Sequence, residues 1–382
     1  MRTFFLVFLI AVFLAGCGGQ ISETSPSAPT QTIPSPTVTA PAETTQPAVM
    51  DPVESLLNSM TVEERVGQVF LARCNAETAP EDIKAYHLGG LILFSQDFEG
   101  ETPDSLRQKI QEYQLLSKLP MLMAVDEEGG TVTRISRYSA FRDQKFPSPR
   151  DAYRSGGMTG ALQNEQDKCE LLSSLGLNVN MGPVCDLSDD PNGFMYPRSL
   201  GQTPETTGEF IAFTVDLMER SQIGSVLKHF PGYGNNSDTH VGIAVDSRSL
   251  EELEQQDLVP FQYGIRAGCG AILVSHTIVE SLDGELPASL SPAVHAYLRK
   301  NMGYEGVIMT DDLVMQAITD LYGAGEAAVM ALQAGNDLLC VTDYAVQYDA
   351  VLSAVLDGRI SVETLDRAVY RLLKWKMDLG LL

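Results

Sequence analysis

Carboxylate, ammonium, guanidinium and imidazole side chains recur in this chain just after short apolar runs. The positions with such groups are Asp126 with Arg134, Asp186, Arg198, Lys228 with His229, Asp238 with His240, His276, and Asp311 with Asp312. No Cys or His cluster with the spacing of a metal site accompanies them. The combination therefore predicts chemistry on a neutral polar substrate that needs neither a metal nor a cofactor.

Eight apolar runs, most of them followed by an amphipathic stretch, must position these side chains. The runs cover residues 66–72, 90–95, 121–125, 177–184, 225–229, 271–276, 306–310 and 337–341. The stretches with helical spacing include residues 104–118, 164–174, 205–220, 250–267, 292–301, 325–334 and 362–377. This alternation predicts an α/β fold, a single (β/α)8 barrel of the TIM type.

A doubly wound sheet is the alternative fold for such an alternation. No G-x-G-x-x-G follows the first run and no G-x-x-x-x-G-K-[ST] occurs, so nothing in the chain indicates a nucleotide ligand. In a (β/α)8 barrel the chemistry lies where the strands end and the next loops begin. The charged groups described above occupy those positions.

Five short motifs contain or adjoin these charged residues: VDEEGG at residues 125–130, PRSLG at 197–201, KHFPGYG at 228–234, DTH at 238–240 and TDDL at 310–313. They resemble those of glycoside hydrolase family 3, and within it the β-N-acetylglucosaminidase branch in its bacterial lipoprotein form. They follow the family's order, and the resemblance runs from around Met60 to the end of the chain. It implies a retaining exo-β-N-acetylglucosaminidase that removes terminal non-reducing β-GlcNAc through a covalent glycosyl-aspartate.

The resemblance also implies roles for the catalytic residues. Asp311 in TDDL would be the nucleophile, because a carboxylate there can attack the anomeric carbon and later leave. Strand alternation places Asp311 and Asp312 on opposite faces, and Asp312 is the alternative nucleophile. His240 in DTH would be the general acid and base, with Asp238 fixing its tautomer.

The same matching implies that a ring of charged and polar side chains holds the sugar through charge-assisted hydrogen bonds. These residues are Asp126, Arg134, Arg198, Lys228 and His229. For Arg198 and Lys228 a buried salt bridge is the alternative interpretation. His276 resembles a pocket histidine of the family, and packing at a strand end is the alternative for it.

The chain departs from the family's pattern at three places. Tyr233 stands where many relatives have histidine, and the loop between Gly234 and Asp238 is one residue shorter. Thr131 stands where relatives often carry arginine. We therefore expect a changed reach for His240 and looser contacts beyond the terminal sugar.

The first fifty residues have the composition of a leader and a linker. Arg2 precedes an apolar run at residues 4–15 that is too short to span a membrane, and Leu14-Ala15-Gly16-Cys17 resembles the bacterial lipobox. We expect a lipoprotein signal peptide at residues 1–16, lipidation of Cys17 and a disordered Ser/Thr/Pro-rich linker at residues 17–50. The catalytic barrel would cover residues 51–382, anchored by lipid at the extracytoplasmic face of the cell membrane.

The chain of 382 residues has a formal charge of −24, from 26 Lys and Arg against 50 Asp and Glu. Such an excess repels phosphate backbones and anionic lipids, so we expect no nucleic-acid partner and membrane contact through the lipid anchor only. We expect a monomer that acts on a small carbohydrate. The five cysteines after Cys17 are widely spaced and odd in number, which indicates buried thiols rather than a disulfide framework.

Other interpretations of the function stay open. Peptidoglycan fragments and chitooligosaccharides are the expected substrates, but a β-glucosidase or a glycoside phosphorylase of the same family would use the same covalent intermediate. A sugar-binding lipoprotein is the alternative of another class. It would need two α/β lobes around a cleft, so the eight repeated units and the pair Asp238 and His240 count against it.

Overall fold

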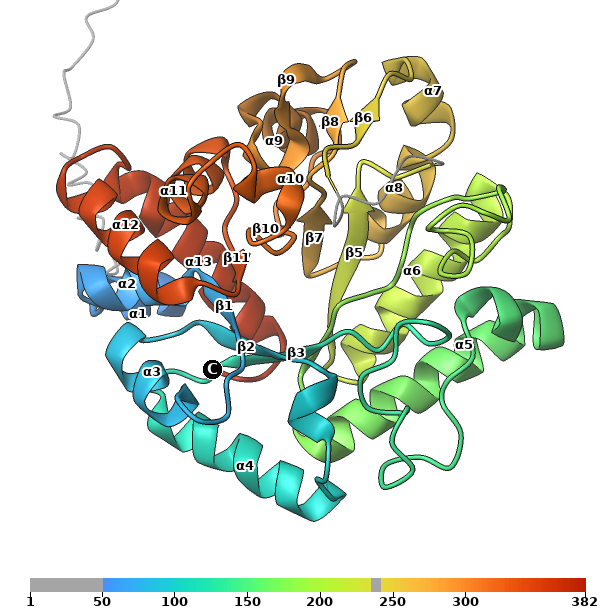
Figure 1. Ribbon diagram of the computed structural model, residues 1–382, viewed down its shortest axis with the longest axis horizontal. Coiled ribbons are helices and arrows are strands. Elements are labelled where there is room, and N and C mark those ends of the chain that lie inside the picture. The colour runs from blue at the N-terminus through green and yellow to red at the C-terminus, as the bar shows by residue number, and fades with distance from the viewer. Residues whose placement is uncertain (1–50, 235–241) are drawn as a thin grey trace, which may run out of the picture. The chain divides into compact units, whose positions relative to one another are not determined.

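Eight parallel strands form a barrel in the computed structural model, which describes residues 51–234 and 242–382 (Figure 1). Neighbouring strands pair in the order β10-β7-β5-β4-β3-β2-β1-β11, and a parallel bridge between Met309 and Leu338 joins the two ends. The strands are β1 Phe70–Arg73, β2 Gly90–Leu93, β3 Leu122–Val125, β4 Val179–Asn180, β5 Gly224–Phe230, β7 Ala271–Val274, β10 Val307–Thr310 and β11 Leu339–Val341. Each of the eight predicted runs overlaps one of these strands, so the predicted (β/α)8 barrel is confirmed.

Helices form the outer ring, and in Figure 1 the chain colour passes around this ring once, so consecutive strand–helix units are neighbours. The longer helices are α3 Ala79–Tyr86, α4 Pro103–Leu116, α5 Pro149–Leu175, α6 Pro204–Arg220, α8 Leu258–Arg266, α11 Ala324–Ala334, α12 Tyr344–Leu356 and α13 Val362–Asp378. The shorter ones are α1 Pro52–Asn58, α2 Val62–Gln68, α7 Leu250–Gln255, α9 Pro292–Ala296 and α10 Gln316–Thr319. None of the helices in these two ranges is long and apolar enough to cross a membrane.

Side-chain caps fix where many helices begin. Thr61 and Glu64 form a capping box at the start of α2. Thr203 caps α6 with proline at its first position, and Ser361 caps α13. Each cap satisfies a backbone N–H that the helix itself leaves without a partner.

The structure differs from the predicted elements at several boundaries. The run expected at residues 66–72 begins inside α2, because the capping box starts a helix whose buried face includes Val66. The stretch at residues 250–267 divides into α7 and α8, since the backbone of Gln256 is not helical. Sequence patterning missed α3 and α12, and it missed the first half of α5, which is kinked at Gly157.

A small second sheet lies outside the barrel. It has the order β6-β8-β9, with β6 Val245–Asp246, β8 Ile278–Val279 and β9 Asp283–Pro287. Strands β8 and β9 belong to the connection between β7 and α9, so this sheet joins two loops that follow barrel strands. Figure 1 shows it beside the end of β5.

The core contains two large apolar clusters, and both include residues of the barrel strands. The larger cluster includes Leu71, Met123 and Val341, and the smaller one includes Leu227 and Ile272. All five cysteines of the described residues are buried and unpaired, as predicted: Cys74, Cys169, Cys185, Cys269 and Cys340.

Candidate active site

A cleft of about 680 Å³ opens at the carboxyl ends of the barrel strands. Six of the predicted site residues line it: Asp126, Arg134, Arg198, Lys228, His229 and Asp311. They come from loops and strand ends that are far apart in the sequence, and the barrel brings them to one place. Asp238, His240 and Cys17 lie outside the residues that the structure describes.

A bulge in β5 explains how two consecutive residues both reach the cleft. The pairing of β5 with β7 shifts register between Leu227 and Phe230. In a regular strand Lys228 and His229 would point to opposite faces, whereas a bulge re-aims a side chain. Both residues line the cleft, and both are buried.

A network of buried ion pairs forms one wall of the cleft. Lys228 Nζ lies 2.5 Å from Oδ1 of Asp126 and 2.7 Å from Oε1 of Glu128. Arg198 donates to both carboxylate oxygens of Glu128, at 2.9 Å and 2.7 Å. Such a bidentate pair fixes the guanidinium plane as well as its position.

The charges in this network stabilise one another. Burial alone would raise the pKa of Glu128, but Arg198 and Lys228 outweigh it and hold that pKa well below its usual range. Burial alone would lower the pKa of Lys228, yet Asp126 and Glu128 leave it raised. The network therefore stays ionised at neutral pH, with the partly exposed carboxylate of Asp126 facing the cleft.

The loop after β3 is held from beneath by Glu127. This fully buried carboxylate accepts hydrogen bonds from the backbone N–H groups of Arg134 and Ile135 and from the Ser136 hydroxyl. The guanidinium of Arg134 then lies over the Phe94 ring and 3.9 Å from Asp126. Glu127 thus places the start of the loop that brings Arg134 to the cleft.

The adjacent aspartates after β10 have different surroundings. Oδ1 of Asp311 accepts from the backbone N–H of Asp312 at 2.9 Å. The carboxylate of Asp312 accepts from the Thr342 hydroxyl at 2.6 Å and from the backbone N–H of Val314, and burial raises its pKa. Asp312 is thus tied to the loop after β11, although both carboxylates line the cleft.

His276 is fully buried behind these aspartates. Its Nδ1 lies 2.7 Å from the Ser289 hydroxyl, and its Nε2 lies 3.0 Å from the backbone oxygen of Asp312. The ring therefore holds the backbone that carries the aspartate pair.

Residues 61–375 match the model of the glycosyl hydrolase family 3 N terminal domain. The chain belongs to glycoside hydrolase family 3. This membership confirms the predicted family and the predicted enzyme class, a glycoside hydrolase.

Relatives of this family 3 chain support the match over most of its length. The beta-hexosaminidase LpqI of Mycobacterium tuberculosis (strain ATCC 25618 / H37Rv) is 30% identical over 396 residues, which cover 98% of this chain and 97% of the relative. A family 3 beta-N-acetylglucosaminidase from Paenibacillus sp. str. FPU-7 has a TM-score of 0.80 at 32% identity, covering 85% of this chain and 63% of that one. The structure of M. tuberculosis LpqI has a TM-score of 0.78 at 28% identity, covering 85% and 96%.

Several residues that line the cleft, or lie buried behind it, were not predicted as site residues. Glu128 is the second glutamate of the VDEEGG motif, and only its burial between two cations reveals its part in the network. Arg73 and Phe94 line the cleft from β1 and from the end of β2, and Arg73 lies over the Phe94 ring at 4.5 Å. Their positions at strand ends were the available signal, but no motif singled them out.

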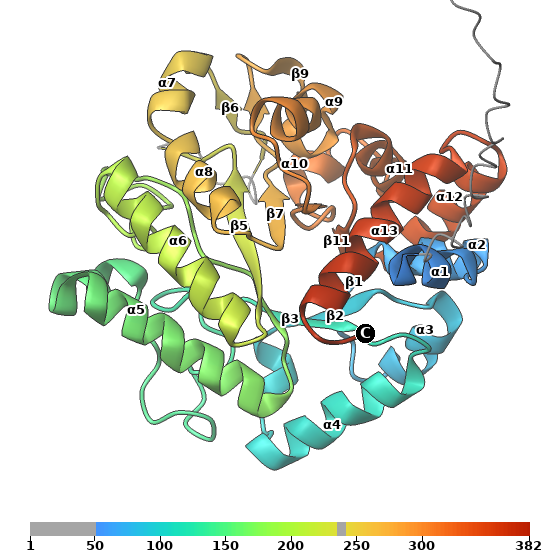
Figure 2. The same ribbon diagram turned by 180° about the vertical axis from the view of Figure 1, so that it is seen from behind.

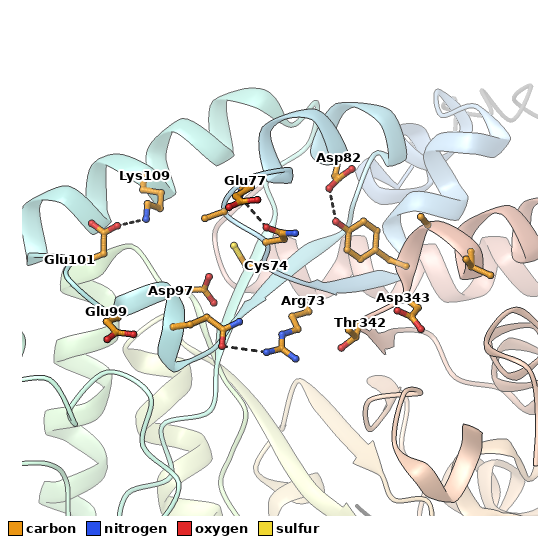
Figure 3. A pocket seen from close by; sticks show the side chains of 16 residues that line it. Arg73, Cys74, Glu77, Asp82, Asp97, Glu99, Glu101, Lys109, Thr342 and Asp343 are labelled. Carbon is orange, nitrogen blue, oxygen red and sulfur yellow. Dashed lines mark hydrogen bonds and ion pairs between the residues drawn. The ribbon is translucent and has the colours of Figure 1, made fainter. Parts of the chain in front are cut away.

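A second cavity of about 730 Å³ lies beside this cleft, after β1, β2 and β11 (Figure 3). Figure 3 shows the pair Glu101 and Lys109 at one end and Asp343 at the other, with Arg73 between them. Arg73 also lines the cleft described above, so the two cavities meet at this side chain. Three of the six carboxylates that line the second cavity are exposed: Glu77, Glu99 and Asp343.

Among residues 51–234 and 242–382 no group of three His, Cys, Asp or Glu side chains could hold a metal ion. The cleft's cations are Arg73, Arg134, Arg198 and Lys228, and the last two are bound to carboxylates. The described part of the cleft can therefore offer hydrogen bonds from fixed charges to a polar ligand.

Proposed function

We propose that this family 3 hydrolase is a retaining exo-β-N-acetylglucosaminidase. It would remove terminal non-reducing β-GlcNAc residues from peptidoglycan fragments or chitooligosaccharides. The observation that carries the proposal is the cleft in which Asp311 and the pair Asp126 and Lys228 come together. The names of the relatives, beta-hexosaminidase and beta-N-acetylglucosaminidase, support the choice of sugar.

In the first step a carboxylate oxygen of Asp311 attacks the anomeric carbon, and the bond from that carbon to the glycosidic oxygen breaks. His240, oriented by Asp238, gives its proton to the departing oxygen. In the second step His240 takes a proton from water, the water oxygen bonds to the anomeric carbon, and Asp311 leaves as a carboxylate. Two inversions at the same carbon retain the β configuration.

The sugar would be held by the charged wall of the cleft. Asp126 can accept hydrogen bonds from sugar hydroxyls, and Lys228 and Arg134 beside it can donate. Arg198 and His229 would complete the ring. The ion pairs of Arg198 and Lys228 with the buried carboxylate of Glu128 are compatible with this role, because they fix the donors before the sugar arrives.

We further propose that lipidation of Cys17 holds the enzyme at the extracytoplasmic face of the cell membrane, as a monomer. Residues 17–50 would then serve as a linker to the catalytic barrel. The basis is the lipobox-like sequence before Cys17 and the Ser/Thr/Pro-rich composition that follows it.

The nucleophile assignment is tested by two alanine variants with azide rescue. Asp311→Ala should lose at least roughly a thousandfold in kcat for p-nitrophenyl β-GlcNAc. Added azide should restore p-nitrophenol release and yield the α-glycosyl azide, because azide then attacks from the side that Asp311 occupied. Asp343→Asn, an exposed carboxylate in the second cavity, is the matched control and should retain full activity.

Rescue of Asp312→Ala in place of Asp311→Ala would assign the nucleophile to Asp312. Parallel assays with p-nitrophenyl β-glucoside, and with phosphate present, decide between this proposal and the two other enzymes. Faster glucoside turnover would indicate a β-glucosidase, and release of a sugar 1-phosphate would indicate a phosphorylase. Sugar binding without any turnover would indicate a binding lipoprotein.

A further inference from the structure

Asp186 is a buried carboxylate that follows β4 and lies next to the cleft without lining it. It accepts three hydrogen bonds from the end of β5 and the turn that follows it. Oδ2 accepts from the backbone N–H of His229 at 3.0 Å and from ring atom Nδ1 of His229 at 2.7 Å. Oδ1 accepts from the backbone N–H of Tyr233 at 2.8 Å.

These contacts determine where the proton of the His229 ring lies. An ionised carboxylate can only accept a hydrogen bond, so the Nδ1 that faces Asp186 carries the proton. A guanidinium can only donate, and an Arg198 nitrogen lies 3.2 Å from Nε2 of His229, so Nε2 presents its lone pair. The ring is therefore neutral and held in the Nδ1–H tautomer between a fixed acceptor and a fixed donor.

Asp186 also fixes the turn that begins at His229. The backbone N–H of Gly232 donates to the oxygen of His229 at 2.8 Å, and Asp186 binds the N–H groups at residues 229 and 233. The ring of Tyr233 packs edge-on against that of His229, with centroids 5.2 Å apart. A single carboxylate thus sets the ring plane, the tautomer and the turn.

We propose that Asp186 is a positioning residue of the active site, which acts through His229 on Arg198. Arg198 divides its donors between Glu128 and Nε2 of His229. If the ring proton moved to Nε2, two donors would face each other and Arg198 would have to shift. Asp186 prevents this, and it keeps the guanidinium aligned in the cleft where the sugar is proposed to bind.

A purely structural role for Asp186 would also make its loss destabilising, so stability alone does not test the proposal. The discriminating property is the proton position on His229. This property can be read in the unmodified protein and does not depend on the enzyme's substrate. The expected effect on turnover, in contrast, rests on the proposed function.

The first experiment measures the ring ¹⁵N shifts of the five histidines by long-range ¹H–¹⁵N correlation at neutral pH. The His229 signals are identified by their loss in His229→Gln. The expected result is a protonated Nδ1 and an unprotonated Nε2. An Nε2–H tautomer, or a doubly protonated ring, would overturn the proposal.

The second experiment compares Asp186→Asn with Asp337→Asn. An amide has one acceptor oxygen, so it cannot satisfy all three donors that Asp186 binds. Asp337 is an equally buried aspartate before β11, and it accepts from Ile308, Arg299 and Arg371 away from the cleft. Both variants should have lower melting temperatures, but Asp186→Asn alone should change the His229 ring shifts.

Asp186→Asn should also lower kcat/KM for p-nitrophenyl β-GlcNAc by about tenfold or more, since a misplaced binding group affects the transition state. Asp337→Asn should stay within about twofold below its melting temperature. Unchanged kcat/KM or unchanged ring shifts in Asp186→Asn would refute a positioning role. If Asp186→Asn does not fold, the same two measurements are made on Asp186→Glu, which keeps the negative charge.

The two proposals fail in different ways. If the wild-type protein hydrolyses no aryl glycoside, the proposed function fails. The ring shifts of His229 in the wild type and in Asp186→Asn then still decide whether Asp186 positions His229.

Discussion

For Arg198 the sequence left two interpretations open, sugar binding and a buried salt bridge, and the structure is compatible with both. It forms a buried, bidentate salt bridge with Glu128, and it also lines the cleft. A buried pair of this kind is not by itself strong evidence for stability, since desolvation of both charges offsets much of their attraction. Its geometric effect is clearer, because the planar guanidinium is held in one orientation.

Replacing Arg198 by lysine separates charge from geometry. Lysine keeps the positive charge for Glu128 but cannot form two parallel hydrogen bonds and reach His229 at the same time. We expect KM for p-nitrophenyl β-GlcNAc to rise about tenfold or more while the protein stays folded. Steady-state kinetics and a thermal melt check this, and an unchanged KM would leave only the salt-bridge interpretation for Arg198.

Lys376 differs from Arg198, because its buried ammonium group has no carboxylate partner among the described residues. It lies in α13, and its ammonium group donates to the side-chain oxygen of Gln68 at 2.7 Å. No ion pair with Lys376 occurs within the two ranges that the structure describes. Burial lowers its pKa from 10.5 to about 7.

Lys376→Met should therefore stabilise the protein most below about pH 7, where the buried lysine of the wild type is protonated, and less as the pH rises. Between pH 7 and 10.5 the unfolded chain binds more protons than the folded one, so the lysine's contribution to stability rises with pH through this window. The stability difference between Lys376→Met and the wild type should shrink by on the order of 3 kcal/mol from pH 7 to pH 10. Urea unfolding at both pH values measures it, with exposed Lys374→Met as the control.

Helix α13 packs against the amino-terminal ends of β5 and β7, and Figure 2 shows the molecule from the side on which this helix lies toward the viewer. The tryptophan of this helix, Trp375, packs against the starts of two strands. A β-carbon at Gly270 would lie 2.0 Å from Nε1 of Trp375, and one at Gly224 would lie 2.7 Å from its ring. The absence of side chains at these glycines allows the helix to approach the barrel.

Gly270→Ala should force α13 away from the barrel and lower the free energy of unfolding by about 1–3 kcal/mol. Because Trp375 is the chain's single tryptophan, its fluorescence should shift to longer wavelength as it becomes more exposed. The matched control is Gly156→Ala in α5, where nothing lies within 4 Å of the added carbon. A blue-shifted or unchanged spectrum in Gly270→Ala would contradict this account of the packing.

At the scale of elements, the sequence predicted every barrel strand because buried parallel strands form distinct apolar runs between polar stretches. The sequence did not predict the helices whose pattern of apolar residues differs from that of a simple amphipathic helix. Helix α12 has apolar side chains around much of its circumference, including Val346 and Leu356 on its exposed face, so it shows little helical periodicity. The division between α7 and α8 depends on the backbone of Gln256, which no residue type indicated.

At the scale of the whole molecule, positions at strand ends predicted six of the side chains that line the cleft. Closure of the barrel brings residues from β3, β5 and β10 to one cleft, as their positions in the chain suggested. The network around Glu128 and Asp186 could not be predicted in the same way. It depends on the bulge in β5 and on buried contacts between loops, which one sequence does not encode as a visible pattern.

The proposed membrane attachment would depend on the charge of the whole chain as well as on Cys17. With 50 acidic against 26 basic side chains, adsorption to anionic lipids is unfavourable, so attachment should depend on the acyl chains at Cys17. Cys17→Ser, expressed in a bacterium that processes lipoproteins, should move from the membrane fraction to the soluble fraction. Its kcat/KM for p-nitrophenyl β-GlcNAc should equal that of the wild type, and continued membrane association would contradict the anchor.

The five buried thiols make that same variant a convenient starting point for site-specific labelling. In Cys17→Ser the remaining cysteines are all shielded from solvent, and burial raises the pKa of Cys74, Cys169 and Cys269 to about 12. Thiolates are the reactive form, so these cysteines should react slowly with maleimides. A cysteine introduced at exposed Val346 would then carry a fluorophore or spin label almost alone, at the rim of the second cavity.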